Sequence, residues 1–264
     1  MSALSLRILA IVLMLIDHIG YFTGESVFRI VGRLSFPIFA FLIANGFKFT
    51  RNVYRYAARL GVFAIISEFV FDVCINGGKV VFVTFSGVIP RLKLDNVFFT
   101  LLIGLCFLII NRFLNTHMKR PWLVSLPLLL FMSYFATFAG SDYGALGVLW
   151  VVLFGVFDVA EKKNRVPLAI GAVLLACWRV VIKSITAALN VSFAGVPVVN
   201  AFIQSGNIGF MDKIQCFAVL SLVFVFLYNS KSGMPKLPIA RTALKYSFYA
   251  FYPLHIIILY FVFG

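Results

Sequence analysis

Long apolar runs separated by short polar stretches repeat along the whole chain. Runs such as LLIGLCFLIINRF and LWVVLFGVF are longer and more uniformly apolar than the alternating strands of a membrane β-barrel. A helix satisfies its own backbone hydrogen bonds, as a segment surrounded by hydrocarbon must. The pattern therefore predicts an all-α, polytopic bundle of about nine transmembrane helices, within a range of eight to ten. The predicted spans are residues 5–22, 27–48, 54–75, 95–113, 121–139, 142–159, 166–188, 213–230 and 244–263.

Two stretches are less apolar than the rest. Residues 76–94 and 189–212 are rich in Gly and Val, which is typical of surface loops, re-entrant pieces or short interfacial helices. No internal repeat and no soluble domain interrupts the succession of spans. We predict a single transmembrane domain over residues 1–264.

Composition and charge support a membrane protein. The chain is 62% hydrophobic and 12% charged, with a mean hydropathy of +1.03, and these values exclude an ordinary soluble domain. The net charge of +14 does not indicate a nucleic-acid partner, because basic residues accumulate in the cytoplasmic loops of membrane proteins. A cytoplasmic N-terminus puts 14 of the 23 Lys and Arg residues at the inner side and six at the opposite side. We predict a multi-pass protein of the inner or plasma membrane, with its N-terminus in the cytoplasm.

Polar residues interrupt several predicted spans at a similar depth. A charge within a bilayer costs about 3 kcal/mol on the mildest scale, so such residues need an explanation. With the N-terminus inside, most of them lie in the outer half of the membrane, which favours one buried polar site. The ionisable candidates are Asp17, His18, Arg33, Glu68 and His255, and the further polar candidates are Asn45, Asn96, Asp142 and Tyr143.

These polar residues admit three interpretations. They can be structural ion pairs between helices, for example Arg33 with Asp17 or Glu68. A carboxylate beside a histidine is also the basic unit of general-base catalysis, and equally of a proton relay in a transporter. No HExxH motif and no His pair at i and i+4 occurs, so the sequence predicts no metal site.

A cationic stripe lies on the predicted cytoplasmic side. Arg51, Arg55 and Arg59 recur every four residues and therefore share one helix face. The stripe is explained either by topology alone or by a phosphate-binding entrance for an anionic ligand. Arg7 lies 11 residues before His18, about 16 Å along the same face of the first span.

Four stretches carry a resemblance to a known family: MLIDHIGYF, GRLSFPIFAFLIANGFKFTRN, YAARLGVFAIISEFVFD and FYAFYPLHI. They resemble the TraX family of membrane proteins, which is associated with N-acetylation of pilin in conjugation systems. The spacing of Arg7 and His18 is also similar to that in the larger membrane acyltransferase superfamily that acetylates sugars. The chain has Asn45-Gly46-Phe47 where the sugar acetylases have Ser-Gly-Phe.

The resemblance implies an acetyl-CoA-dependent acyltransferase whose acceptor is an amine or hydroxyl of a peptide, sugar or lipid, the peptide N-terminus being the one the family suggests. It implies that His18 is the general base, that Asp17 orients it, and that Arg33 stabilises an oxyanion or anchors the substrate. Glu68 and His255 would be supporting acid/base groups. Arg51, Arg55, Arg59 and Arg7 would contact the CoA phosphates, and Asn45, Asn96, Asp142 and Tyr143 the acceptor. Two alternatives remain, a proton-coupled transporter or flippase and a non-catalytic membrane assembly factor.

Overall fold

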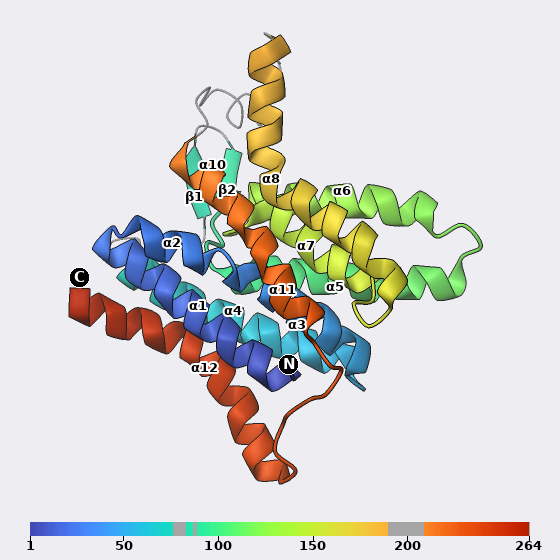
Figure 1. Ribbon diagram of the computed structural model, residues 1–264, viewed down its shortest axis with the longest axis horizontal. Helices are drawn as coiled ribbons and strands as arrows, with labels where there is room; N and C mark the ends of the chain where they lie inside the picture. Colours follow the sequence, from blue (N-terminus) through green and yellow to red (C-terminus); the bar gives the residue numbers. More distant parts are fainter. Residues whose placement is uncertain (76–82, 87–88, 190–208, 264) are drawn as a thin grey trace.

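The computed structural model describes residues 1–75, 83–86, 89–189 and 209–263, and it is a bundle of helices (Figure 1). The first four helices are α1 (Ala3–Thr23), α2 (Ser26–Gly32), α3 (Ser35–Phe49) and α4 (Val53–Cys74). The central ones are α5 (Val97–His117), α6 (Trp122–Phe138), α7 (Gly144–Val156), the 3₁₀ turn η1 (Lys162–Asn164) and α8 (Arg165–Leu189). The last are α10 (Phe210–Gln215), the 3₁₀ helix η2 (Cys216–Leu220), α11 (Ser221–Phe226) and α12 (Pro238–Phe263).

One short hairpin accompanies the helices. Strands β1 (Val83–Ser86) and β2 (Ile89–Leu92) pair antiparallel, so part of the stretch 76–94 is extended structure rather than the loop, re-entrant piece or interfacial helix expected there. Residues 76–82 and 87–88 lie outside the described residues, and so do residues 190–208, which make up most of the stretch 189–212.

Short polar residues fix where several helices begin. The side chain of Ser2 accepts a hydrogen bond from the backbone N–H of Ser5 at the start of α1, and Asn52 accepts one from the N–H of Arg55 at the start of α4. Such caps satisfy backbone donors that the first turn of a helix leaves unpaired. Gly24 ends α1 with φ of 77°, a left-handed conformation that glycine adopts without strain.

The predicted span 27–48 is broken into α2 and α3 at Arg33 and Leu34. Pro37 explains the break, because it has no N–H to give to the carbonyl of Arg33 four residues earlier. Proline is tolerated in the first turn of a helix, so α3 continues through it. The break turns the Arg33 side chain towards α1, where it meets Asp17.

The described helices include five that are long and apolar enough to cross a membrane: Ala3–Thr23, Ser26–Phe49, Val97–His117, Lys162–Ile185 and Pro238–Phe263. Each of the nine predicted ranges overlaps helical structure. However, α6 and α7 are shorter apolar helices, and at 1.5 Å per residue α7 is only about 20 Å long. The range 213–230 is divided among α10, η2 and α11. The chain is a helical membrane protein, and the number of nine spans stays a prediction.

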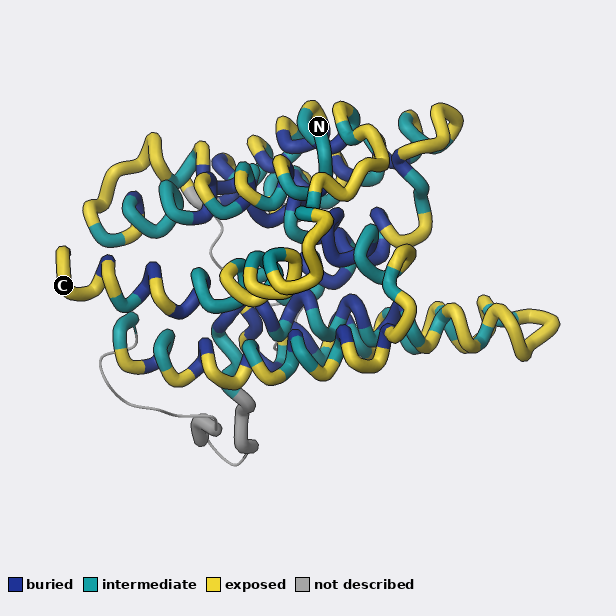
Figure 2. The backbone as a smooth tube through the Cα atoms, turned by 90° about the horizontal axis from the view of Figure 1, so that it is seen from below, coloured by how far each residue is buried: buried dark blue, intermediate teal, exposed yellow. Residues whose placement is uncertain are grey.

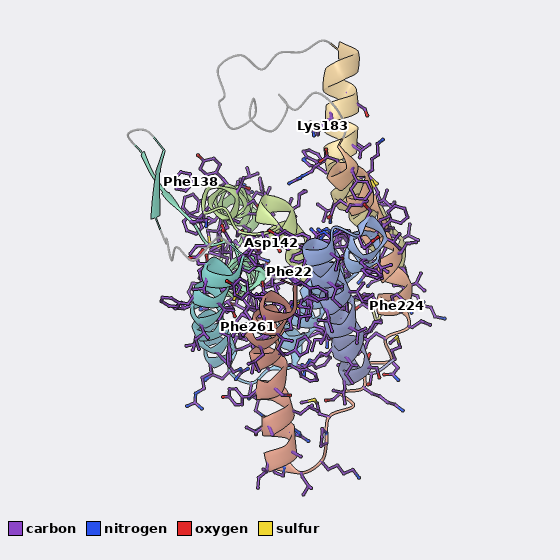
Figure 3. The ribbon with its side chains drawn as sticks, turned by 90° about the vertical axis from the view of Figure 1, so that its left-hand side faces the viewer. Phe22, Phe138, Asp142, Lys183, Phe224 and Phe261 are labelled. Carbon is purple, nitrogen blue, oxygen red and sulfur yellow. The ribbon has the colours of Figure 1, made fainter. Side chains whose placement is uncertain are left out.

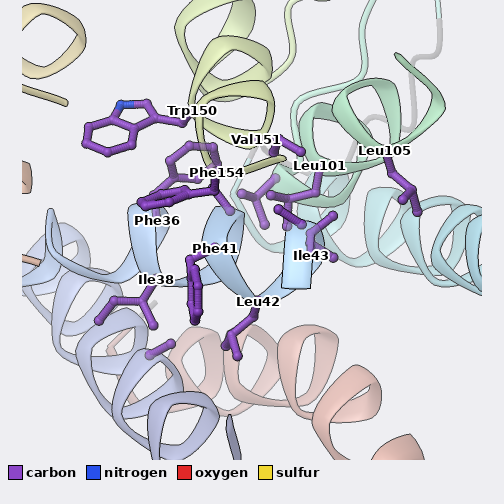
Figure 4. Packing of buried hydrophobic residues seen from close by; sticks show 14 of the residues in the cluster. Phe36, Ile38, Phe41, Leu42, Ile43, Leu101, Leu105, Trp150, Val151 and Phe154 are labelled. Carbon is purple, nitrogen blue, oxygen red and sulfur yellow. The ribbon is translucent and has the colours of Figure 1, made fainter. Parts of the chain in front are cut away.

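Helix α3 forms the centre of the packing (Figure 4). Its buried side chains Phe36, Ile38 and Phe41 point in different directions, towards α7 on one side and α1 on the other. Gly104 on α5 permits a close approach to α7, because a Cβ there would lie 2.7 Å from the Cβ of Val151. Exposed residues are concentrated on the outward faces of the helices (Figure 2), and many are large and apolar, as a lipid-facing surface requires.

Candidate functional site

A cavity of about 140 Å³ lies among α1, α2, α3, α4, α5 and α12 and the turn between α6 and α7. We call it the histidine cavity. Its polar lining includes residues that are distant in the sequence, among them Asp17, His18, Arg29, Arg33, Asp142 and Tyr143. The structure thus brings five of the predicted site residues into one place and adds Arg29.

The hydrogen bonds of His18 show which ring nitrogen carries the proton in the neutral imidazole. Its Nδ1 lies 3.0 Å from the carbonyl oxygen of Met14, and a carbonyl can only accept. Nδ1 therefore carries the proton, and Nε2 keeps its lone pair. A neutral imidazole in this tautomer can take a proton at Nε2, as a general base must.

His255 provides a second acceptor for the Nδ1 proton of His18. Its Nδ1 lies 2.9 Å from the carbonyl oxygen of Phe251, so by the same reasoning its Nε2 is an acceptor, and that atom is 3.3 Å from Nδ1 of His18. The Nδ1–H of His18 is thus shared between two acceptors, and the two rings meet edge to face at 4.8 Å. His255 is 3% exposed and fixes the tautomer and orientation of His18.

Asp17 has a different role from the one predicted for it. Its carboxylate accepts from the guanidinium of Arg29 at 2.6 Å and from that of Arg33 at 2.6 and 2.7 Å. Among the described residues, the hydrogen-bond partners of His18 are Met14 and His255. The expectation that Asp17 orients His18 is therefore corrected. Asp17 instead fastens α1 to α2, in agreement with the ion-pair interpretation of Asp17 and Arg33.

The Asp17 clamp depends on a glycine. A Cβ at Gly32 would lie 2.2 Å from the Cβ of Asp17 and 2.3 Å from its Oδ1. Because Gly32 has no side chain, the last turn of α2 comes close enough to α1 for two guanidinium groups to reach one carboxylate. The three charged groups leave a net charge of +1 beside the cavity.

Asp142 and Tyr143 form another wall of the cavity, in the turn between α6 and α7. The Tyr143 ring stacks on Phe36 with centroids 3.7 Å apart. Asp142 lies towards the middle of the bundle, whereas Lys183 lies on the part of α8 that projects from it (Figure 3). The Asp142 side chain is exposed at this turn and lines the cavity together with Arg33.

Glu68 is not among the described residues that line the histidine cavity. The side chain is fully buried, and its carboxylate accepts from the backbone N–H groups of Asp95 and Asn96 and from the Asn96 amide. Asn96 in turn caps α5 by accepting from the N–H of Phe98 at 3.0 Å. Glu68 and Asn96 thus hold the start of α5 against α4, and their predicted catalytic and substrate-binding roles have no direct geometric support.

We expect Glu68→Ala to lower the free energy of unfolding by about 3 kcal/mol, because it leaves several buried donors without an acceptor. Unfolding in detergent by denaturant measures the change. The control is Glu161→Ala, whose carboxylate is 50% exposed and pairs with Lys163, so its loss changes stability by less than about 1 kcal/mol. Equal stability of the two variants would contradict the structural role of Glu68.

A second cavity, of about 230 Å³, contains the other group of charges. We call it the basic cavity. Its cationic lining residues are Arg7, Arg59 and Lys245, and its apolar walls include Leu42, Phe98 and Phe248. None of the ion pairs among the described residues involves these three cations. The Nε of Arg59 is buried and has no hydrogen-bond partner there, so the cavity presents unneutralised positive charge.

The remaining predicted residues lie elsewhere. Arg51 and Arg55 are exposed at the start of α4 and belong to neither cavity lining. Asn45 donates to the hydroxyl of Tyr228 at 3.1 Å and ties α3 to the segment after α11. In the described part of the chain, His, Cys, Asp and Glu side chains form no group of three suited to a metal ion.

Two residues of the cavities were missed by the sequence. Arg29 and Lys245 line the histidine cavity and the basic cavity but are not among the site residues predicted from the sequence. The i, i+4 spacing of Arg29 and Arg33 was the available signal, because it places both guanidinium groups on one helix face.

Comparison with known proteins gives a family. The chain is 26% identical over 269 residues to a protein of Dichelobacter nodosus described as "Probable fimbrial assembly protein FimC, serogroup H1", and the match covers 98% of this chain and 94% of that protein. No solved structure matches the chain. The family described as TraX protein matches residues 2–263, and the chain therefore belongs to the TraX family.

Proposed function

We propose that the protein is a membrane-embedded acetyltransferase that takes an acetyl group from acetyl-CoA and transfers it to an amine or hydroxyl, with His18 as the general base. The observation that carries the proposal is the hydrogen bonding of His18. Its Nδ1–H is held by Met14 and His255, which leaves Nε2 as the basic atom of a side chain that lines a cavity with Arg33 and Asp142.

The charges and the apolar walls of the basic cavity support acetyl-CoA as the donor. CoA carries several phosphate charges at one end and an uncharged pantetheine arm ending in the thioester at the other. Arg7, Arg59 and Lys245 would hold the phosphates, because they are cations without carboxylate partners in the described structure. The apolar walls would receive the arm. The expected phosphate contacts therefore change in two ways. Lys245 is added, and Arg51 and Arg55 are left out because they are exposed and lie outside the cavity.

The chemistry requires one proton transfer in each direction. Acetyl-CoA supplies an activated acetyl group, and its C–S bond is exchanged for a C–N or C–O bond to the acceptor. His18 Nε2 takes the proton that the acceptor N–H or O–H loses and returns it to the sulfur that leaves. Arg33 would stabilise the negative charge on the acyl oxygen, and His255 would keep the His18 ring in place throughout.

Two observations support an amine as the acceptor, the position of Asp142 and the description of the relative. A carboxylate at the cavity wall attracts an ammonium group before it loses its proton, which favours an amine over a hydroxyl. The related protein is described as a fimbrial assembly protein, so we propose a pilus-associated peptide amine as the acceptor. The cytosolic location of CoA would place the basic cavity and the N-terminus at the cytoplasmic side of the inner membrane.

We expect acetyl-CoA to raise the unfolding temperature of the detergent-solubilised protein, because a ligand that binds only the folded state stabilises it. Arg59→Gln or Lys245→Gln should weaken binding at least about tenfold, since a charge-assisted hydrogen bond contributes about 1.5–3 kcal/mol. Binding is measured by isothermal titration with acetyl-CoA.

The matched control is Arg51→Gln, which removes an exposed arginine outside both cavities and should leave the affinity within about twofold. Affinities that fall equally in all three variants would show that only long-range charge acts. No binding of acetyl-CoA by the unsubstituted protein would end the proposal.

A further inference from the structure

The two cavities follow one another along the same helices. On α1, Arg7 and Ile11 line the basic cavity, and Met14 and His18 line the histidine cavity. Since Arg7 and His18 are 11 residues apart, they are separated by about 16 Å along the helix. Helix α12 repeats the order, with Lys245, Phe248 and Tyr249 in the basic cavity and Tyr252 in the histidine cavity.

A single side chain, Phe39, lines both cavities among the residues described for them. It lies in the second turn of α3, the helix at the centre of the packing. Its neighbours Ile38 and Ala40 are fully buried, whereas Phe39 is only partly buried. The ring therefore borders open space on a helix that is otherwise closely packed.

Two adjacent residues of α5 line one cavity each, unlike Phe39, which lines both. Val97 lines the histidine cavity and Phe98 the basic cavity, although they are adjacent on α5. The partition between the cavities thus runs between these two residues, and within the described ranges Phe39 is the one residue that borders both sides of it. Removing its ring would join the two volumes where they meet.

We propose that the ring of Phe39 separates the two cavities and sets the largest acyl group that can pass from the basic cavity to His18. This inference rests on the proposed acetyl transfer. With the phosphates held at Arg7, Arg59 and Lys245, only the end of the donor approaches Phe39. A two-carbon acetyl group passes the edge of the ring, and each added methylene must displace it.

Acyl selectivity tests the proposal directly. Transfer is measured with acetyl-, propionyl- and butyryl-CoA, using the unsubstituted protein, Phe39→Leu and Phe39→Ala. One methylene in a closely fitting pocket changes kcat/KM about 10- to 200-fold, so Phe39→Ala should raise the ratio of butyryl to acetyl transfer at least about tenfold, with Phe39→Leu between. Phe39→Trp should lower transfer of every acyl group.

Phe41→Leu is the matched control for Phe39→Leu. Phe41 lies two residues further along α3 and packs against Phe154 and Tyr228, outside both cavities. Its substitution should lower stability and leave the acyl ratio unchanged. Acyl ratios that are equal in the unsubstituted protein and in all three Phe39 variants overturn the inference, and acetyl transfer by the unsubstituted protein shows that the proposed function nevertheless holds.

A labelling experiment tests the partition without any transfer activity. The four cysteines are replaced by alanine, and Lys245→Cys in sealed vesicles identifies the face from which a charged thiosulfonate reaches the basic cavity. From that face, the reagent should modify a Met14→Cys variant at least about tenfold faster when Phe39→Ala is also present. Equal rates with and without Phe39→Ala would refute the partition, whatever the protein transfers.

Discussion

His18→Ala is expected to lower the rate of acetyl transfer about 100- to 10,000-fold, the usual contribution of a positioned general base. The reason is geometric, because Met14 and His255 hold the Nδ1–H and leave Nε2 as the basic atom of a residue that lines the cavity. Alanine removes that atom and can neither accept nor return the proton. Transfer of radiolabelled acetyl to a peptide amine, at saturating acetyl-CoA, measures the loss.

His117→Ala is the control for this experiment. His117 is exposed at the end of α5 and contacts Thr116 and Phe113, so its loss should leave transfer unchanged. The unfolding temperature and the affinity for acetyl-CoA should also stay within error in His18→Ala, which separates a chemical defect from a folding defect. Transfer at more than about half the normal rate by a folded His18→Ala protein would exclude His18 as the base.

The helices could be predicted because hydrocarbon leaves each segment to satisfy its own backbone. Apolar length therefore located helical structure in each predicted range, from residues 5–22 to 244–263. It did not show how a range is divided, as 27–48 is into α2 and α3 and 213–230 into α10, η2 and α11, because hydropathy averaged over a window does not report local backbone geometry. The strands β1 and β2 were not predicted, because the composition of that stretch is equally typical of loops, re-entrant pieces and interfacial helices.

The site was predicted as a set of residue types at one depth, and less well as a set of contacts. Depth brought Asp17, His18, Arg33 and Asp142 together correctly. Partners depend on rotation about each helix axis and on which helices are neighbours, and a single sequence contains neither. For this reason the sequence pairs Asp17 with the adjacent His18, whereas the side chain that contacts His18 is that of His255, 237 residues away.

Asp17→Ala is expected to lower the free energy of unfolding by about 3–5 kcal/mol, the cost of leaving a buried charge without its partner. Asp17 is the common acceptor for Arg29 and Arg33, whose side chains are 18% and 10% exposed. Its removal brings two cations close together in an apolar bundle and releases α2 from α1. Denaturant unfolding in detergent, followed by the circular dichroism of the helices, measures the change.

Two further variants show whether unpaired charge is the cause. Asp158→Ala removes a carboxylate from the more exposed pair with Lys48 and should change stability by less than about 1 kcal/mol. Adding Arg29→Met and Arg33→Met to Asp17→Ala removes all three charges and should restore most of the stability, because apolar side chains of similar volume can replace a buried ionic group. If the triple variant stays as unstable as Asp17→Ala, the clamp stabilises the protein through shape and hydrogen-bond geometry rather than by neutralising charge. If Asp17→Ala is as stable as Asp158→Ala, the clamp does not stabilise the protein by either mechanism.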